Sequence, residues 1–251
     1  MEPLLPGVLE VNRKLEEFSV RGCVLVPDAG QVVVWDTLVE PADMAAVAAL
    51  TTGMAVRVVY SHADWDHCWG TAGLANRDTV IGHTACAERF QNELPAEIAA
   101  MRAADPSRWQ GVQLVPPTET FESTMTVPLG SAQLDLVWVG GHTPDSIVGV
   151  VRDWGLLLAG DVAEDPFPEI GDPLRLNEWI RALETWADDP DLHTVVPGHG
   201  AVGGAKLLKR NAEYLRAVAG GDHRMPTGAN AFYRRVHEQN VKAMAGRPRR
   251  P

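Results

Sequence analysis

The sequence is poor in cysteine, with only Cys23, Cys68 and Cys86 among 251 residues. The three are widely spaced, and no CxxC pair occurs. An odd number of separated cysteines argues against a disulfide framework and against a zinc finger built on thiolates. A reducing compartment fits this usage, and we expect the protein in the cytoplasm.

A long apolar run is also missing. No segment approaches the roughly 18 apolar residues that a bilayer-spanning helix needs. The first 18 residues show no basic stretch followed by a long apolar one, which is the pattern of a secretory signal. These absences argue against membrane insertion and against export.

Positive charge is scarce, because 22 Lys and Arg face 33 Asp and Glu for a formal net charge of −11. Duplex binding relies on clustered basic residues that displace counterions, so nucleic acid is not expected as a partner. The only basic cluster, residues 247–250, reads as a solvated tail. The expected partner is a small-molecule substrate, and the sequence leaves the oligomeric state open.

Composition is otherwise that of a globular protein with a sizeable core, at 45% hydrophobic and 22% charged residues. We expect one domain over residues 1–251, with about 246–251 as a disordered tail. Periodicity predicts strands at Val20–Val26, Gln31–Asp36, Val56–Tyr60, Thr79–Gly82, Val112–Pro116, Met125–Val127, Gln133–Val139, Ile147–Arg152, Leu156–Ala159 and Thr194–Val196. It predicts helices at Pro41–Leu50, Trp69–Ala75, Thr84–Leu94, Pro95–Ala104, Leu176–Ala187, Ala205–Ala219 and Asn230–Met244. This order indicates layered sheets flanked by helices, in an α/β or α+β chain.

Ligand-type residues are concentrated between the strand at Val56–Tyr60 and the helix that follows it. Two histidines and two aspartates, His62, Asp64, Asp66 and His67, fall within six positions. A strand-to-helix connection is a common place for ligands, and imidazole and carboxylate bind zinc, iron and manganese. In an extended loop, Asp66 and His67 diverge, which suits two metal ions better than one. The alternative is that the aspartates cap a helix and the histidines complete a hydrogen-bond network.

Three further turns each end an apolar run with a ligand-type residue beside glycine. They are Gly140-Gly141-His142-Thr143-Pro144-Asp145-Ser146, Ala159-Gly160-Asp161 and Pro197-Gly198-His199-Gly200. Each alone is typical of an ordinary turn. Together with the first loop they form a constellation that indicates a metal site.

The series HADWDH, GHTPDS, LAGD and PGHG resembles, in this order, the motifs of the metallo-β-lactamase-fold superfamily, with a variant H-x-D-x-D-H first motif. The resemblance implies an α+β chain folded as an αββα four-layer sandwich, in which two mixed β-sheets are flanked by helices. It implies that His62, Asp64 and His142 hold one metal ion, that Asp66, His67 and His199 hold the other, and that Asp161 bridges both. Asp36 matches an aspartate that supports the ligand loop from outside, although a plain turn role is an equal alternative.

Asp64 departs from the family pattern, which has histidine at this position. The exchange makes the site one formal charge more negative, and harder metals then become plausible beside zinc. We therefore expect two divalent metal ions, with zinc first and iron or manganese as alternatives. We also expect Asp64→His to strengthen zinc retention.

The implied activity is that of a metal-dependent hydrolase, a dinuclear enzyme. A metal-bridged hydroxide, oriented by Asp66, would cleave an ester, thioester, lactone or amide of a small molecule. Trp65, Trp69 and Phe167 are candidates to line the substrate pocket. The alternatives are a di-iron redox enzyme acting on oxygen, nitric oxide or a sulfur species, a β-lactamase-like activity, and a metal-binding module without catalysis.

Overall fold

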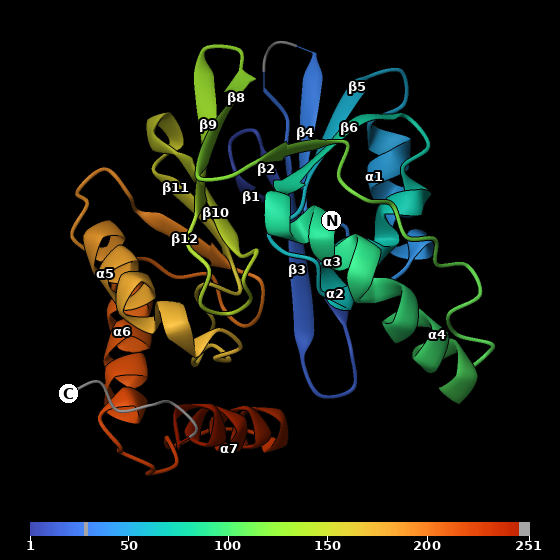
Figure 1. The fold of residues 1–251 in the computed structure, drawn as a ribbon. Coiled ribbons are helices and arrows are strands. Elements are labelled where there is room, and N and C mark those ends of the chain that lie inside the picture. The colour runs from blue at the N-terminus through green and yellow to red at the C-terminus, as the bar shows by residue number, and fades with distance from the viewer. Residues whose placement is uncertain (28–29, 246–251) are drawn as a thin grey trace.

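Two β-sheets form the centre of the computed structural model, which describes residues 1–27 and 30–245 (Figure 1). The first sheet follows chain order and is antiparallel from β1 to β4 and parallel from β4 to β7. Its strands are β1 (Glu2–Leu5), β2 (Val8–Lys14), β3 (Ser19–Leu25), β4 (Gln31–Trp35), β5 (Ala55–Val59), β6 (Arg77–His83) and β7 (Glu119–Phe121).

The second sheet has the order β12-β11-β10-β9-β8, and only its β11–β12 pair is parallel. Its strands are β8 (Thr124–Leu129), β9 (Ala132–Trp138), β10 (Ile147–Val151), β11 (Leu156–Gly160) and β12 (Thr194–Pro197). Both sheets therefore mix parallel and antiparallel pairs, as the resemblance implied.

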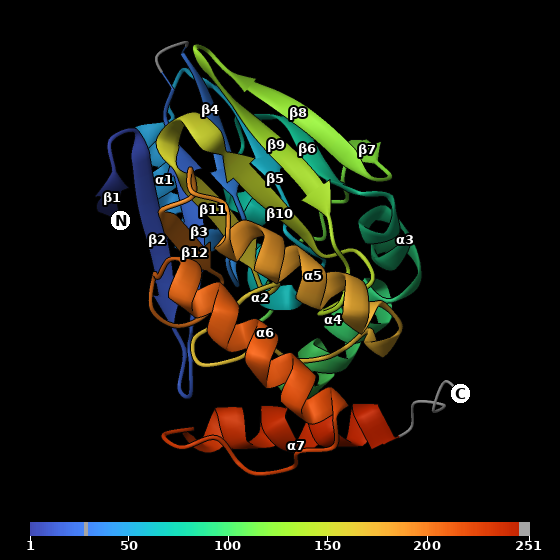
Figure 2. The ribbon, with the colours of Figure 1, turned by 90° about the vertical axis from the view of Figure 1, so that its left-hand side faces the viewer.

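Helices cover the outer faces of the two sheets. On the first sheet lie α1 (Ala45–Leu50), α3 (Thr84–Asn92) and α4 (Leu94–Ala104), and on the second α5 (Leu176–Ala187) and α6 (Ala205–Ala219) (Figures 1 and 2). The short α2 (Trp65–Cys68) follows β5, and α7 (Ala231–Ala245) crosses one end of the sandwich. The described residues also form the 3₁₀ turns η1 (Pro41–Met44), η2 (Trp69–Gly73), η3 (Arg152–Trp154) and η4 (Pro173–Arg175).

Alternating side chains of the central strands are buried on opposite faces of each sheet. In β4, Val32 and Val34 pack under the helices, whereas Val33 and Trp35 pack between the sheets. Strand β11 behaves alike, since Leu157 joins the cluster under α5 and α6 and Leu158 joins the core between the sheets. Strands buried on both faces require apolar residues at nearly every position. The αββα four-layer sandwich is thereby confirmed.

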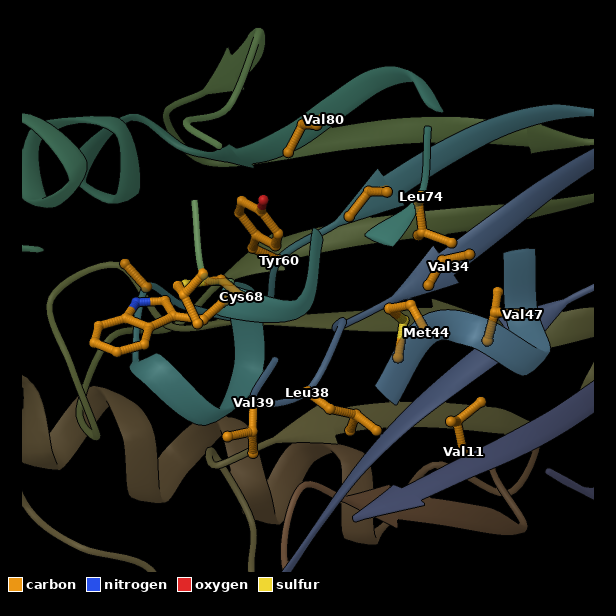
Figure 3. Packing of buried hydrophobic residues seen from close by; sticks show 14 of the residues in the cluster. Val11, Val34, Leu38, Val39, Met44, Val47, Tyr60, Cys68, Leu74 and Val80 are labelled. Carbon is orange, nitrogen blue, oxygen red and sulfur yellow. The ribbon is translucent and has the colours of Figure 1, made fainter. Parts of the chain in front are cut away.

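The cluster under the first sheet's helices also supports the segment that follows β5 (Figure 3). The hydroxyl of the fully buried Tyr60 donates to the Val115 carbonyl at 2.8 Å and lies 2.7 Å from the Thr71 hydroxyl. Trp69 is fully buried in the same cluster. Residues on both sides of His62–His67 are thus fixed in the core, which limits where the loop can move.

Several predicted boundaries differ from the structure. The hairpin β1–β2 was not predicted, and its turn uses Gly7 at φ +76°. The predicted strand Val112–Pro116 is wrong, because this segment has no strand partner and its Val112 carbonyl instead accepts from Arg102. The predicted helix Trp69–Ala75 starts earlier, as α2, and continues as a 3₁₀ turn. The predicted tail, about 246–251, lies outside the described residues.

No helix within the described residues combines the length and the apolar character that crossing a membrane requires.

Candidate metal centre

The predicted ligand residues follow strands that end at one edge of the sandwich. His62 comes after β5, and Asp66 and His67 lie in α2. His142 follows β9, Asp161 follows β11 and His199 follows β12. Because these strands end at the same edge, turns that are far apart in the sequence meet there.

One group of side chains consists of His62, Asp64 and His142. Asp64 Oδ2 lies 3.4 Å from the Nε2 atoms of both His62 and His142. One ligand atom from each residue lies within 4.8 Å of the other two, which is close enough to surround a single cation. The structure therefore brings together the three residues that the resemblance assigns to the first metal.

A second group consists of Asp66, His67 and His199. Asp66 Oδ2 lies 3.5 Å from His199 Nε2 and 4.0 Å from His67 Nε2. The two imidazoles approach each other to 3.4 Å between their Nε2 atoms. These three residues also satisfy the distances for holding one cation.

Asp161 lies between the two groups. Its Oδ2 atom is 3.1 Å from His199 Nε2, 3.4 Å from His67 Nε2, 3.6 Å from His142 Nε2 and 3.8 Å from His62 Nε2. Gly198 makes room for this carboxylate, because a Cβ atom there would lie 2.2 Å from Asp161 Oδ1. One carboxylate reaching four imidazoles has the position of a bridge between two cations.

The four imidazoles share one orientation, in which Nδ1 donates to an acceptor outside the cluster and Nε2 faces inward. The acceptors are Ser61 Oγ for His62 at 2.9 Å, Asp36 Oδ2 for His67 at 2.9 Å, the Glu169 carbonyl for His142 at 3.2 Å and the Ser19 carbonyl for His199 at 2.9 Å. An imidazole whose Nδ1 carries the proton presents its Nε2 lone pair, which is the arrangement of a metal ligand.

Asp36, for which a supporting role and a plain turn role were both expected, accepts hydrogen bonds from the segment that carries the proposed ligands. It accepts from the Ser61 backbone N–H at 2.7 Å, from the Ser61 hydroxyl at 2.7 Å and from His67. The residue has φ +58°, a left-handed conformation that aspartate adopts more readily than most residues. Its carboxylate therefore links the end of β4 to His67 directly and to His62 through the Ser61 hydroxyl.

Three buried polar atoms at the cluster have no hydrogen-bond partner among the described residues: His62 Nε2, His142 Nε2 and Asp161 Oδ1. Leaving a buried polar atom unpaired costs about 1–3 kcal/mol. All three can donate electron pairs, and the two Nε2 atoms face Asp64 and Asp161 inside the cluster. The residues present thus fit a pair of cations, which would satisfy these atoms.

Without a bound cation, the raised pKa values of His67, His142 and His199 would leave these three imidazoles protonated at neutral pH. Burial opposes the charged form, yet the hydrogen bond to Asp64 and the charge of Asp161 raise the pKa of His142 to about 10. For His199 burial is again overcome, and the charge of Asp161 raises the pKa to about 9. Cations therefore compete with protons for this site.

Glu164 belongs to the same region and was not predicted from the sequence. It is buried, and one of its oxygens lies within 4.8 Å of ligand atoms of His142 and Asp161. Burial and the charge of Asp161 raise its pKa to about 8, and Tyr233 of α7 donates to its Oε2 at 3.0 Å. No local sequence motif identifies Glu164, because its hydrogen-bond partner Tyr233 lies 69 residues away in the sequence.

Arg89 was missed for the same reason. This residue of α3 contacts Asp64 and Asp145, which lie 25 and 56 residues away in the sequence. Asp145 belongs to the predicted turn that carries His142, but its partners could not be read from that turn.

A cavity of about 240 Å³ opens beside His199 and is lined by Phe18, Asn230 and Tyr233 among others. The Phe18 ring lies edge-on to the rings of His199 at 5.1 Å and Trp65 at 6.3 Å between centroids. Trp65, one of the three aromatic residues predicted for the pocket, is half-buried and contacts this cavity only through the Phe18 ring.

The other two predicted pocket residues have packing roles. Trp69 is fully buried and meets Trp109 edge-on, with centroids 5.5 Å apart. Phe167 is 2% exposed and stacks on Tyr214 at 4.2 Å beneath α7. Neither residue lines the cavity beside His199, so their place in a substrate pocket stays a prediction.

Four layers with a histidine and aspartate cluster at one sheet edge define an αββα sandwich protein with a candidate metal centre. The sequence model of the Metallo-beta-lactamase superfamily matches residues 21–199. The chain belongs to this superfamily, most of whose members are hydrolytic enzymes.

The individual proteins that this chain resembles have low sequence identity to it. The chain is 30% identical over 189 residues to an acyl-coenzyme A thioesterase, MBLAC2 of Bos taurus, in a match that covers 68% of this chain and 65% of the relative. It resembles the structure of a metallo-beta-lactamase family protein from Thermus thermophilus with a TM-score of 0.67, at 17% identity over 87% of this chain and 82% of the other. It also resembles the metallo-beta-lactamase FIM-1 from Pseudomonas aeruginosa in its mono-zinc form, with a TM-score of 0.64, at 18% identity over 86% and 93%.

Proposed function

We propose that the protein is a metal-dependent hydrolase that cleaves a thioester or a related ester, lactone or amide of a small molecule. The observation that carries this proposal is the position of Asp161, whose Oδ2 lies within 3.8 Å of four inward-facing imidazoles. The named activity of the Bos taurus relative favours a thioester among these substrates. This chain matches only 65% of the length of the relative. Thioesterase activity is therefore proposed for this chain.

The proposed ligands are those that the sequence indicated: His62, Asp64 and His142 for one ion, Asp66, His67 and His199 for the other, and Asp161 for both. When bound, divalent ions supply Lewis acidity, which activates water near neutral pH and polarises a carbonyl. Zinc is the proposed metal, since histidine and aspartate are among its usual ligands.

The protein's own groups would divide the remaining tasks. Asp66 would orient the attacking water and accept its proton, because its carboxylate is 6% exposed and faces His199. The acyl part of the substrate would lie against Phe18 in the cavity beside His199, with Trp65 packed edge-on to the Phe18 ring.

A panel assay tests this proposal. Zinc-loaded protein is incubated with acyl-coenzyme A thioesters, aryl esters, lactones and a β-lactam, and free thiol or acid is measured. We expect thioester hydrolysis that is abolished by a chelator and absent from Asp161→Ala. A metal-loaded protein that hydrolyses none of these substrates faster than Asp161→Ala would disprove the proposal.

The alternative of a di-iron redox enzyme is favoured by one observation, the carboxylate of Asp64 facing His62 and His142 where the family has imidazole. Metal analysis of the purified protein separates the two functions. Iron, together with turnover that requires an electron donor, would support the redox enzyme, whereas zinc with hydrolysis would exclude it.

A further inference from the structure

Arg89 forms a two-pronged contact beside the candidate metal centre. Its Nη2 donates to Asp64 Oδ1 at 2.7 Å and its Nη1 donates to Asp145 Oδ1 at 2.9 Å. The guanidinium is 15% exposed and comes from α3, which supplies none of the proposed ligands. Charge-assisted bonds with this geometry are among the stronger contacts in proteins and fix the orientation of both carboxylates.

Asp145 extends the contact to the backbone of the ligand loop. Its second oxygen, Oδ2, accepts from the Ala63 N–H at 2.8 Å, and its side chain is fully buried. Ala63 lies between His62 and Asp64. Arg89 and Asp145 therefore fix both the side chain of Asp64 and the peptide that joins His62 to Ala63.

The two oxygens of Asp64 have separate partners. Oδ1 is taken by Arg89, whereas Oδ2 faces the Nε2 atoms of His62 and His142. A carboxylate can serve a donor on one side and a cation on the other because both of its oxygens accept. A neutral imidazole cannot, because once one nitrogen binds a metal the other carries a proton and can only donate. Facing a guanidinium, which also only donates, that N–H has no acceptor.

We propose that Arg89 is a positioning residue for the first metal ion, and that its contact makes aspartate, rather than the histidine usual in the family, the ligand that position 64 requires. This inference rests on the proposed metal centre and deepens it. It also reverses the expectation from the sequence that Asp64→His strengthens zinc retention, since that expectation took no account of Arg89.

A double-mutant cycle tests the proposal. Zn²⁺ affinity and Zn²⁺ per chain are measured for the wild type, Asp64→His, Arg89→Gln and the double variant, by chelator competition and elemental analysis. Each single change is expected to weaken the first site about 10-fold to 100-fold, the usual effect of losing a group that orients a ligand. The double variant is expected to recover most of this loss, because the amide oxygen introduced by Arg89→Gln would accept from the imidazole N–H.

A second cycle uses Asp64→Asn, alone and combined with Arg89→Gln, in case the histidine variants do not fold. Asparagine has the same size as aspartate. In Asp64→Asn, Arg89 would draw the amide oxygen towards itself and leave the NH₂ group, which cannot bind a metal, facing His62 and His142. Combined with Arg89→Gln, the amide can turn its oxygen inward and regain affinity.

Arg13→Gln is the matched control, since Arg13 also bridges two carboxylates, Glu40 and Asp43, away from the ligands. It should leave Zn²⁺ affinity unchanged. Additive losses in both cycles, or an Asp64→His variant that binds as tightly as the wild type, would overturn the role of Arg89. Absence of Zn²⁺ binding by the wild type would overturn the proposed function as well, so the two failures are distinguishable.

Discussion

His67 donates through Nδ1 to Asp36 Oδ2 at 2.9 Å, and both side chains are completely enclosed. The bond fixes the imidazole so that its Nε2 faces Asp161, 3.4 Å away. Because Asp36 also holds Ser61, the residue before His62, one carboxylate orients parts of both proposed metal sites.

Asp36→Asn should therefore weaken metal binding without unfolding the protein. Asparagine tolerates the left-handed backbone at this position, but its amide presents only one accepting oxygen in place of two. We expect a loss of about 10-fold to 100-fold in Zn²⁺ affinity, measured by chelator competition. Asp43→Asn, which removes a buried carboxylate far from the ligands, should have no such effect.

Removing the shared ligand should differ from removing a ligand of one site. Asp161→Ala is expected to lose both metal ions, and His142→Ala only the first, because Asp161 approaches imidazoles of both groups. Elemental analysis of the purified variants measures this difference. Equal metal content in the two variants would contradict the bridging position of Asp161.

Metal uptake should depend on pH. His142 and His199 have pKa values raised to about 10 and about 9, so both are protonated at neutral pH until a cation displaces the protons. Apparent Zn²⁺ affinity should therefore rise from pH 6 towards pH 9, and binding at pH 7 should release at least about one proton per ion. Calorimetry in buffers of different ionisation enthalpy counts these protons. Binding without proton release would be inconsistent with the raised pKa values.

Glu164 should make the chelator-treated protein less stable as the pH rises. Its pKa is raised from 4.5 to about 8, so the folded protein holds a proton that the unfolded chain has released. The favourable contribution is complete below about pH 4.5 and is lost as the pH rises through about 8. Near pH 6, the unfolding free energy should fall less steeply with pH in Glu164→Gln than in the wild type. The slopes should differ by about 1 kcal/mol per pH unit, as measured by urea unfolding. Tyr233→Phe keeps the acid and should retain the slope.

Shortening Phe18 should affect substrate binding more than the chemical step. The ring borders the cavity beside His199 and stacks on Phe232 at 4.6 Å between centroids. Phenylalanine has no atom that could bind a metal ion. Phe18→Ala should raise KM for a long-chain acyl thioester several-fold, with little change in kcat or in metal content. The exposed Leu174, outside this cavity, provides the control variant Leu174→Ala. A fall in kcat at unchanged KM would place Phe18 in the reaction instead.

The layered architecture could be predicted because local patterns of apolar residues indicate its strands and helices. Apolar runs such as Val32–Trp35 and Leu156–Ala159 mark strands buried on both faces, and the helices between them carry apolar stripes. Predictions failed where partners decide structure. Val112–Pro116 has strand-like composition, but its carbonyls are bonded by the side chains of Arg102 and Tyr60 rather than by a neighbouring strand.

The amino-acid sequence was enough to indicate which residues could form the candidate centre, since each ligand-type residue lies in a glycine-bearing turn or in the loop and short helix that follow β5. The groups that surround these residues became visible only in the folded chain. Arg89 reaches Asp64 from α3 and Tyr233 reaches Glu164 from α7, across 25 and 69 residues of chain. Such contacts form only when the two sheets stack and the helices pack against the sheets. Local spacing of residues in the sequence therefore does not predict these contacts.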